Sequence, residues 1–174
     1  MTDMICLIEP AIPALRRYAQ GLMRDPSAAD DLVQDCLEHA VSRWHQRRAG
    51  GDARTWMFSI LHNLAISRLR QNQRRGRHVT LDDIDEGATS RPPPQEHSVR
   101  HGELLRSLDL LPEDLRSVLL LVSVEDLSYA EAARVLDIPI GTVMSRLSRA
   151  RERLARLMNA EAPASDAPML RRVK

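Results

Sequence analysis

Residues 139–154, PIGTVMSRLSRARERL, predict a helix with two chemically different faces. Apolar residues recur at every third or fourth position, which is the period of one side of an α-helix. This stripe consists of Val143, Leu147, Ala150, Leu154 and Leu157. Threonine, serine and arginine occupy the opposite side. Such a helix packs by one face and offers hydrogen-bond donors and positive charge on the other.

The preceding residues predict a shorter helix that leads into this one. Ser128 and Glu131 form the S-x-x-E pattern of a capping box, which starts a helix. The predicted apolar side of that helix is Tyr129, Ala132, Ala133 and Leu136. Residues 137–140 then form a short turn, and Pro139 suits the entry to the next helix. Two helices joined this closely, the second with a basic outward face, match a DNA-binding helix-turn-helix.

An ordinary pair of helices with a solvated arginine face explains the periodicity equally well. The combination of capping box, alanine pair, turn and outward hydroxyl and guanidinium groups favours DNA. In this interpretation the first half of the second helix enters a major groove. The candidates for base or nearby phosphate contacts are Thr142, Met144, Ser145, Ser148 and Arg149. The candidates for phosphate contacts or for flanks of the packing face are Arg146, Arg151 and Arg153.

The composition predicts an all-α protein. Apolar residues make up 43% of the 174, enough for a core, whereas aromatic residues make up only 3%. Packing through Leu, Val, Ile and Ala favours helices over a β-sandwich. No apolar run reaches about 18 residues, so we expect no membrane insertion, and the first twenty residues do not resemble a signal peptide.

The chain has two cysteines, too few for a disulfide framework and without metal-ligand spacing. A reduced cytoplasmic location is therefore expected. We expect Cys6 and Cys36 to be small buried apolar residues, and a redox role is the alternative. The sequence indicates neither a metal site nor a cofactor.

The net charge of +1 conceals a strong segregation along the chain. Residues 46–81 carry a net charge of +7 and residues 139–158 carry +4, whereas residues 82–98 and 99–138 carry −4 each. Two basic blocks separated by acidic ones indicate two places where a polyanion docks.

Periodicity and composition predict two small helical domains joined by a flexible linker. The first spans residues 1–78, with Ser27 expected as the cap of a helix whose apolar side is Leu32, Val33, Cys36, Leu37, Ala40 and Trp44. A long, increasingly basic helix follows from residue 55. An acidic, proline-rich linker spans residues 79–98, because three consecutive prolines and no apolar period exclude a packed element. The second domain spans residues 99–160, and a weakly ordered tail spans residues 161–174.

Taken together, the segments resemble an extracytoplasmic-function sigma factor, a small member of the sigma-70 family. The stretch AADDLVQDCLEHA resembles the region-two helix that grips RNA polymerase, and ARTWMFSILHNLAISRLRQNQRR resembles the segment that recognises and melts the −10 element. The stretch from LPEDLRSVLLL to SRARERL resembles region four, which reads the −35 element. Three such segments in this order are a more specific signal than any one of them.

The resemblance implies contacts to the β′ clamp helices of core RNA polymerase, and β-flap contacts as well. The implied β′-contacting residues are Asp30, Asp31, Leu32, Gln34, Asp35 and Glu38. An acidic rim steers association, and apolar contacts add affinity. A merely solvated helix face is the alternative, and the residues alone favour it.

The resemblance also implies two DNA-binding surfaces. The residues implied at the −10 element are Arg47, Arg48, Arg54, His62, Asn63, Arg68, Arg70, Arg74 and Arg75. Melted DNA needs a basic groove and a pocket for an extruded base. Trp56 is either a stacking platform for that base or a core residue, and its apolar neighbours favour the core. The residues implied at the −35 element are Pro139, Gly141, Thr142, Met144, Ser145, Arg146, Ser148, Arg149 and Arg151.

Three positions depart from the family pattern. Asp137 stands where the turn often has glycine, and Met144 and Ser148 stand where charged or bulky residues are common. The departures at Met144 and Ser148 leave the −35 sequence open. The linker is expected along the product channel of the polymerase, where its charge mimics nucleic acid, with a plain tether as the alternative.

A sigma factor binds polymerase and promoter DNA and catalyses no reaction, so we expect no enzyme activity. Such factors are usually held inactive by an anti-sigma factor. A sigma-like adaptor that titrates an anti-sigma factor is one rival, but known mimics carry a receiver domain for which the chain is short. A stand-alone helix-turn-helix regulator is another, and it leaves the first domain unexplained. An enzyme is the third, although the histidines show no H-E-x-x-H spacing and no G-x-S-x-G motif occurs.

Overall fold

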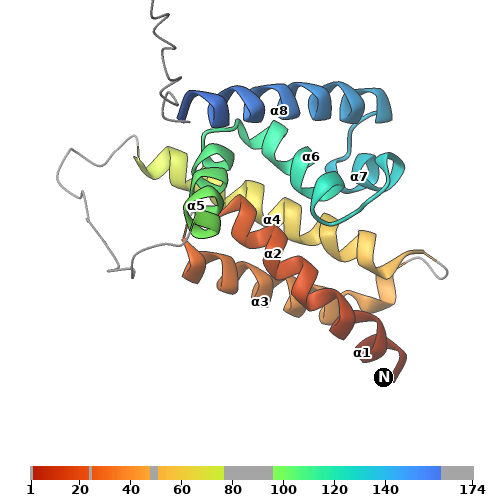
Figure 1. Ribbon diagram of the computed structural model, residues 1–174. Helices are drawn as coiled ribbons and strands as arrows, with labels where there is room; N and C mark the ends of the chain where they lie inside the picture. The colour runs from red at the N-terminus through yellow and green to blue at the C-terminus, as the bar shows by residue number, and fades with distance from the viewer. Residues whose placement is uncertain (1, 24, 48–50, 77–95, 162–174) are drawn as a thin grey trace, which may run out of the picture.

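The computed structural model describes residues 2–23, 25–47, 51–76 and 96–161 (Figure 1). Within these ranges every regular element is helical, which confirms the all-α expectation. The first group of helices is α1 (Thr2–Ile8), η1 (Glu9–Ala11), α2 (Ile12–Leu22), α3 (Pro26–Ser42), η2 (Trp44–Gln46) and α4 (Ala53–Gly76). The second group is α5 (Glu96–Asp109), α6 (Glu113–Ser123), α7 (Tyr129–Leu136) and α8 (Ile140–Glu161). The predicted linker up to residue 95 and the tail from residue 162 lie outside the described residues.

The starts of α3 and α4 are set by aspartate caps. Asp25, not Ser27 as predicted, is the N-cap of α3: its Oδ1 accepts a hydrogen bond from the Ser27 N–H at 3.0 Å, and proline holds the first helical position. Ahead of α4, Asp52 accepts hydrogen bonds from the backbone N–H groups of Arg54 and Thr55 at 3.1 and 3.0 Å. Partial burial raises the pKa of Asp52, but the hydrogen bond from the Thr55 hydroxyl, the two backbone bonds and the charge of Arg54 together hold that pKa below its usual range.

The first group packs α2, α3 and α4 against one another. The predicted apolar side of α3 is confirmed, since Leu32, Val33, Cys36 and Ala40 are buried. Leu37 and Trp44 are partly buried against the same core.

The second group contains the predicted helix-turn-helix. The capping box is present, with the Ser128 N–H donating to Glu131 Oε2 at 2.8 Å and the Glu131 N–H donating to Ser128 Oγ at 3.3 Å. On α7, Ala132 is buried as predicted, but Tyr129 remains 37% exposed and Val135 takes the inward position instead. The apolar stripe of α8 is confirmed, since Val143, Leu147 and Ala150 are buried and Leu154 and Leu157 pack against the core.

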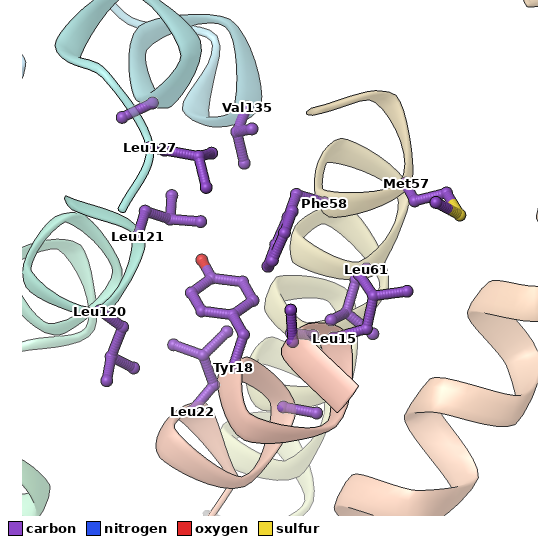
Figure 2. Packing of buried hydrophobic residues seen from close by; sticks show 14 of the residues in the cluster. Leu15, Tyr18, Leu22, Met57, Phe58, Leu61, Leu120, Leu121, Leu127 and Val135 are labelled. Carbon is purple, nitrogen blue, oxygen red and sulfur yellow. The ribbon is translucent and has the colours of Figure 1, made fainter. Parts of the chain in front are cut away.

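The two groups share one hydrophobic core, because α2 packs against α6 and α4 packs against α7. Figure 2 shows Tyr18 of α2, Phe58 of α4, Leu121 of α6 and Val135 of α7 converging on this core. Gly21 allows the close approach of α2 and α6: a Cβ added there would lie 2.7 Å from Leu120 Cδ1. We call this packing of the first group on the second the closed arrangement.

The two cysteines differ in environment. Cys36 is buried as predicted, its thiol donates to the Met57 carbonyl oxygen at 3.5 Å, and burial raises the pKa of the thiol to about 12. Cys6 is exposed, so the expectation that it is buried is wrong. Among the described helices, none combines the length and the apolar character needed to cross a membrane.

Candidate nucleic-acid and polymerase interfaces

The turn of the helix-turn-helix uses a left-handed residue. Asp137 follows α7 with φ 52° and ψ 48°, and its N–H donates to the Ala133 carbonyl oxygen. Glycine enters this conformation without strain, and aspartate is one of the few other residues that tolerate it. The aspartate at this position is therefore compatible with the tight turn that orients α8.

Seven of the nine −35 candidates are exposed on α8 or in the turn just before it, which agrees with the predicted outward face. Those exposed are Pro139, Gly141, Met144, Ser145, Ser148, Arg149 and Arg151. Thr142 and Arg146 are half-buried. None of the nine belongs to the core, so this surface is open in the closed arrangement.

The arginines of this face already have intramolecular partners. Arg149 Nε donates to the Ser145 carbonyl oxygen at 3.2 Å, and its Nη2 lies 3.4 Å from Ser145 Oγ. Arg146 forms an ion pair with Asp114 of α6 at 3.4 Å. These contacts orient the guanidinium groups before any DNA is bound.

Four of the six polymerase candidates on α3 are exposed, one is half-buried and one is buried. Asp30, Asp31, Gln34 and Glu38 are exposed, and Asp30 pairs with Arg16 at 3.2 Å. The side chain of Leu32 is fully buried in the core, which corrects its expected place at the polymerase surface. Asp35 is half-buried and bound by Arg68.

The −10 candidates divide in the same way. Asn63, Arg70 and Arg74 are exposed on α4. Arg47 stacks on Trp44, with its guanidinium carbon 4.6 Å from the ring centroid. Arg48 lies outside the described residues, as does the side chain of Arg75.

The side chains of three further −10 candidates, Arg54, Arg68 and His62, contact other residues of the protein. Arg54 donates to the Glu125 carbonyl oxygen at 2.7 Å, and Arg68 contacts Asp35 and the Ala28 carbonyl oxygen. His62 is buried. These three side chains are not free to follow a DNA backbone, which corrects the prediction. Only the Arg54 contact crosses between the two groups, since the partners of Arg68 and His62 belong to the first group.

His62 forms a buried polar pair with Tyr18. Its Nδ1 lies 3.0 Å from the Tyr18 hydroxyl. Burial lowers the pKa of His62 to about 4, so the ring is neutral at neutral pH. Burial also raises the pKa of Tyr18 above its usual value, so its hydroxyl stays protonated and can donate to the ring.

Trp56 is half-buried and packs on the core, as its apolar neighbours predicted. Its ring meets Trp44 edge to face, with centroids 6.0 Å apart. The pair joins η2 to the first turn of α4.

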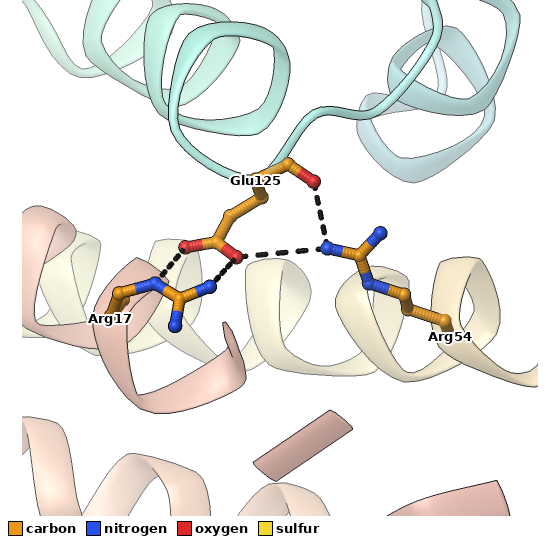
Figure 3. Close-up of polar contacts among 3 residues, drawn as sticks. All are labelled: Arg17, Arg54 and Glu125. Atoms are coloured by element: carbon orange, nitrogen blue, oxygen red, sulfur yellow. Dashed lines mark hydrogen bonds and ion pairs between the residues drawn. The ribbon is translucent and has the colours of Figure 1, made fainter. Parts of the chain in front are cut away.

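Glu125 links the two groups and was not identified from the sequence. Figure 3 shows its carboxylate between Arg17 of α2 and Arg54 of α4. Arg17 binds it through Nε and Nη2 at 3.1 and 2.9 Å, and the Arg54 Nη2 lies 3.8 Å from Oε2. The Glu125 side chain is fully buried, whereas both arginines are about half exposed.

Two hollows lie where the groups meet. A cavity of about 220 Å³ brings His62 and Arg70 of α4 together with Glu113 and Asp114 of α6 and Arg146 of α8. A larger groove of about 710 Å³ is lined by both groups: Leu22, Met23, Asp25, Ala28, Leu69, Asn72, Gln73, Asp109, Leu110, Leu111, Pro112, Glu113 and Arg116. Among the residues that the structure describes, no group of His, Cys, Asp or Glu is placed to hold a metal ion.

The chain matches known proteins along both groups. Residues 8–62 match the family described as the Sigma2 domain of PhyR, and residues 101–154 match the family described as Sigma-70, region 4. The ECF RNA polymerase sigma factor EcfG of Rhodopseudomonas palustris is 34% identical over 152 residues, which cover 85% of this chain and 81% of that protein.

Solved structures share the arrangement of helices. The sigma factor RpoE of Bartonella quintana, in complex with the anti-sigma factor NepR, is 30% identical with a TM-score of 0.77, over 92% of this chain and 99% of that one. The anti-anti-sigma factor PhyR of the same organism, also complexed with NepR, is 18% identical with a TM-score of 0.56, over 89% of this chain and 49% of that one. At that identity the likeness to PhyR extends to the fold alone.

Proposed function

Because this chain belongs to the extracytoplasmic-function sigma factors, which direct core RNA polymerase to promoters, we propose that α3 binds the polymerase, α4 reads the −10 element and α8 reads the −35 element. The observation that carries the proposal is the second helix of the helix-turn-helix, because eight candidate residues on α8 and Pro139 just before it all lie outside the core. An exposed row of hydroxyl and guanidinium groups on such a helix suits a major groove.

We propose that the closed arrangement reads the −35 element but not the −10 element. The face of α8 is open, whereas Arg54, His62 and Arg68 of α4 are held by contacts within the molecule. Polymerase would separate the two groups and release Arg54 from Glu125, whereas the partners of His62 and Arg68 lie within the first group. The binding energy of two joined modules would offset strand opening.

Run-off transcription with purified core polymerase and genomic fragments tests the function. Promoter-specific transcripts are expected only when the chain is present. Arg149→Ala should reduce transcription from promoters that depend on their −35 element. DNA binding without polymerase, and no specific transcript with it, would instead favour a stand-alone regulator.

The polymerase surface is tested by charge reversal. Asp31 is exposed on α3 and has no ion pair among the described residues, so Asp31→Lys should weaken polymerase binding without unfolding the chain. Glu9→Lys is the matched control, because Glu9 is exposed on η1 outside the proposed surface. Equal binding of both variants in a pull-down would refute the role of α3.

We propose that an anti-sigma factor controls this chain, as the complex of its Bartonella relative with NepR suggests. The groove of about 710 Å³ touches both groups, so a partner segment lying in it would hold the closed arrangement together. Exposed Leu110 at its edge offers an apolar contact. Leu110→Glu should weaken capture by such a partner and leave transcription with polymerase unchanged.

A sigma-like adaptor is the second candidate, favoured by the match of residues 8–62 to the Sigma2 domain of PhyR. The 34% identity to EcfG over most of both chains supports the sigma factor instead. The run-off assay separates the two, since an adaptor yields no promoter-specific transcript. We further propose that the chain works in the cytoplasm, where polymerase is, and catalyses no reaction itself.

A further inference from the structure

A strip on one side of α8, formed by Ile140, Met144 and Ser148, is exposed and uncharged, and its first two side chains are apolar. Ile140 and Met144 are 46% and 48% exposed, and exposed Ser148 continues the same line at a spacing of four residues. Residues four apart stack on one side of a helix. Neither apolar side chain belongs to the core, so packing does not explain their type.

The neighbouring arginines are directed away from this strip. Arg146, on the flank, is turned toward Asp114 of α6. Arg149 folds back onto Ser145, with contacts of 3.2 and 3.4 Å to its carbonyl and hydroxyl oxygens. The strip of Ile140, Met144 and Ser148 therefore lies beside a hydrogen-bonding line formed by Ser145 and Arg149.

The major groove presents one apolar group to a protein, the 5-methyl group of thymine. An exposed methionine gains free energy only when it leaves water against another apolar surface. Methionine is also unbranched and adapts its shape to an irregular surface. The geometry points to a specificity-determining role: we propose that Met144 contacts a thymine methyl group of the −35 element, beside the base pair that Arg149 reads.

This inference rests on the proposed function and predicts a property of the element. The −35 sequence must contain an A·T pair next to the pair contacted by Arg149. Ile140, at the first position of the helix, extends the apolar contact toward the flanking sugar or base.

The test compares two promoter templates that differ only in the −35 element, with thymine in one and uracil in the other. Uracil lacks the methyl group and keeps the same base pairing. With core polymerase and the full chain, run-off transcription at limiting chain concentration should fall roughly fourfold for each contacted methyl group.

Three variants test whether Met144 causes the preference for the thymine template. Met144→Gln should transcribe equally from both templates, and Met144→Leu should retain the preference for thymine because it restores an apolar contact. Met158→Gln is the matched control, since Met158 is exposed on the same helix about 21 Å away along its axis. It should keep the wild-type preference, and an unchanged melting temperature confirms that each variant is folded.

Several outcomes would overturn the proposal. One is wild-type transcription that does not respond to uracil, and another is a −35 element without an A·T pair. A third is that Met144→Gln lowers transcription by the same factor from both templates and keeps the preference for thymine, which would assign Met144 to a protein contact. If no template yields a promoter-specific transcript, the sigma function itself fails, and the inference fails with it. That result is distinct from active transcription that ignores the methyl group.

Discussion

His62 is 44 positions from Tyr18 in the chain, yet its ring meets the Tyr18 hydroxyl in the core. The sequence placed this histidine on a basic helix and predicted a DNA contact. Burial in the core lowers the pKa of His62 to about 4. A side chain that looks like a DNA ligand in sequence is thus a neutral packing residue in the closed arrangement.

This pair predicts a pH dependence of stability. The unfolded chain binds a proton to His62 near pH 6.5, whereas the folded chain does so only near pH 4, so the unfolded state is favoured as pH falls through that window. The contribution lost is about 3 kcal/mol, following the size of the shift. Urea unfolding at a series of pH values should show this fall.

His62→Gln keeps a hydrogen-bonding partner for Tyr18 and should flatten the slope between pH 6.5 and 4. His45→Gln, at an exposed position, is the control and should leave the slope as in the wild type. An identical slope in all three proteins would contradict the role assigned to His62.

At the scale of elements, α7 and α8 follow local rules. The capping box at Ser128 and Glu131, and the buried stripe of α8, were predicted from the sequence and are confirmed. Cap chemistry involves residues three apart, and a helix stripe repeats every three to four, so both are readable in one short window. The error at Tyr129 arises because α7 packs against α4 as well as α8, which turns Val135 inward instead.

The turn between these helices gives a second prediction. Asp137 holds φ 52°, a conformation that costs every residue except glycine. Asp137→Gly should therefore stabilise the chain by about 0.5–1 kcal/mol in urea unfolding. Asp137→Val should destabilise it, because a β-branched residue is strained at positive φ. The reverse order would show that the aspartate side chain makes a contact worth more than the strain.

At the scale of the whole molecule, the closed arrangement depends on contacts between residues far apart in sequence. Glu125 lies 108 positions from Arg17 and 71 from Arg54. Gly21 brings α2 against Leu120 of α6. Leaving the buried Glu125 carboxylate without its arginine partners would cost free energy, so these contacts hold the two groups together. We call Glu125 with Arg17 and Arg54 the clasp.

Glu125→Gln should shift the equilibrium from the closed arrangement toward an open form, in which the two groups are apart. The amide keeps the volume but loses the charge that binds both arginines. Because those arginines are half exposed, we expect a loss on the order of 1–2 kcal/mol, close to a tenfold shift toward the open form. Small-angle X-ray scattering should report a larger radius of gyration, and single-stranded −10 DNA should bind more tightly once Arg54 is released.

Asp126→Asn is the matched control. Asp126 is the next residue in the same turn, is exposed, and has φ 54°, which asparagine tolerates. Its radius of gyration and DNA binding should equal those of the wild type. If Glu125→Gln behaves like this control, the clasp does not hold the two groups together.

The sequence by itself determined the helical class, the helix-turn-helix, the outward face of α8 and the two basic blocks. Each of these depends on residue type and on spacings of a few positions, which a linear pattern preserves. Tertiary structure decided which candidates are free to act: Leu32 and His62 are buried, and Arg54 and Arg68 are paired, whereas Asn63 and Arg149 remain exposed. Burial and ion pairing depend on neighbours from distant parts of the chain, and a carboxylate such as Glu125 has no local pattern that distinguishes a buried clasp from a solvated surface charge.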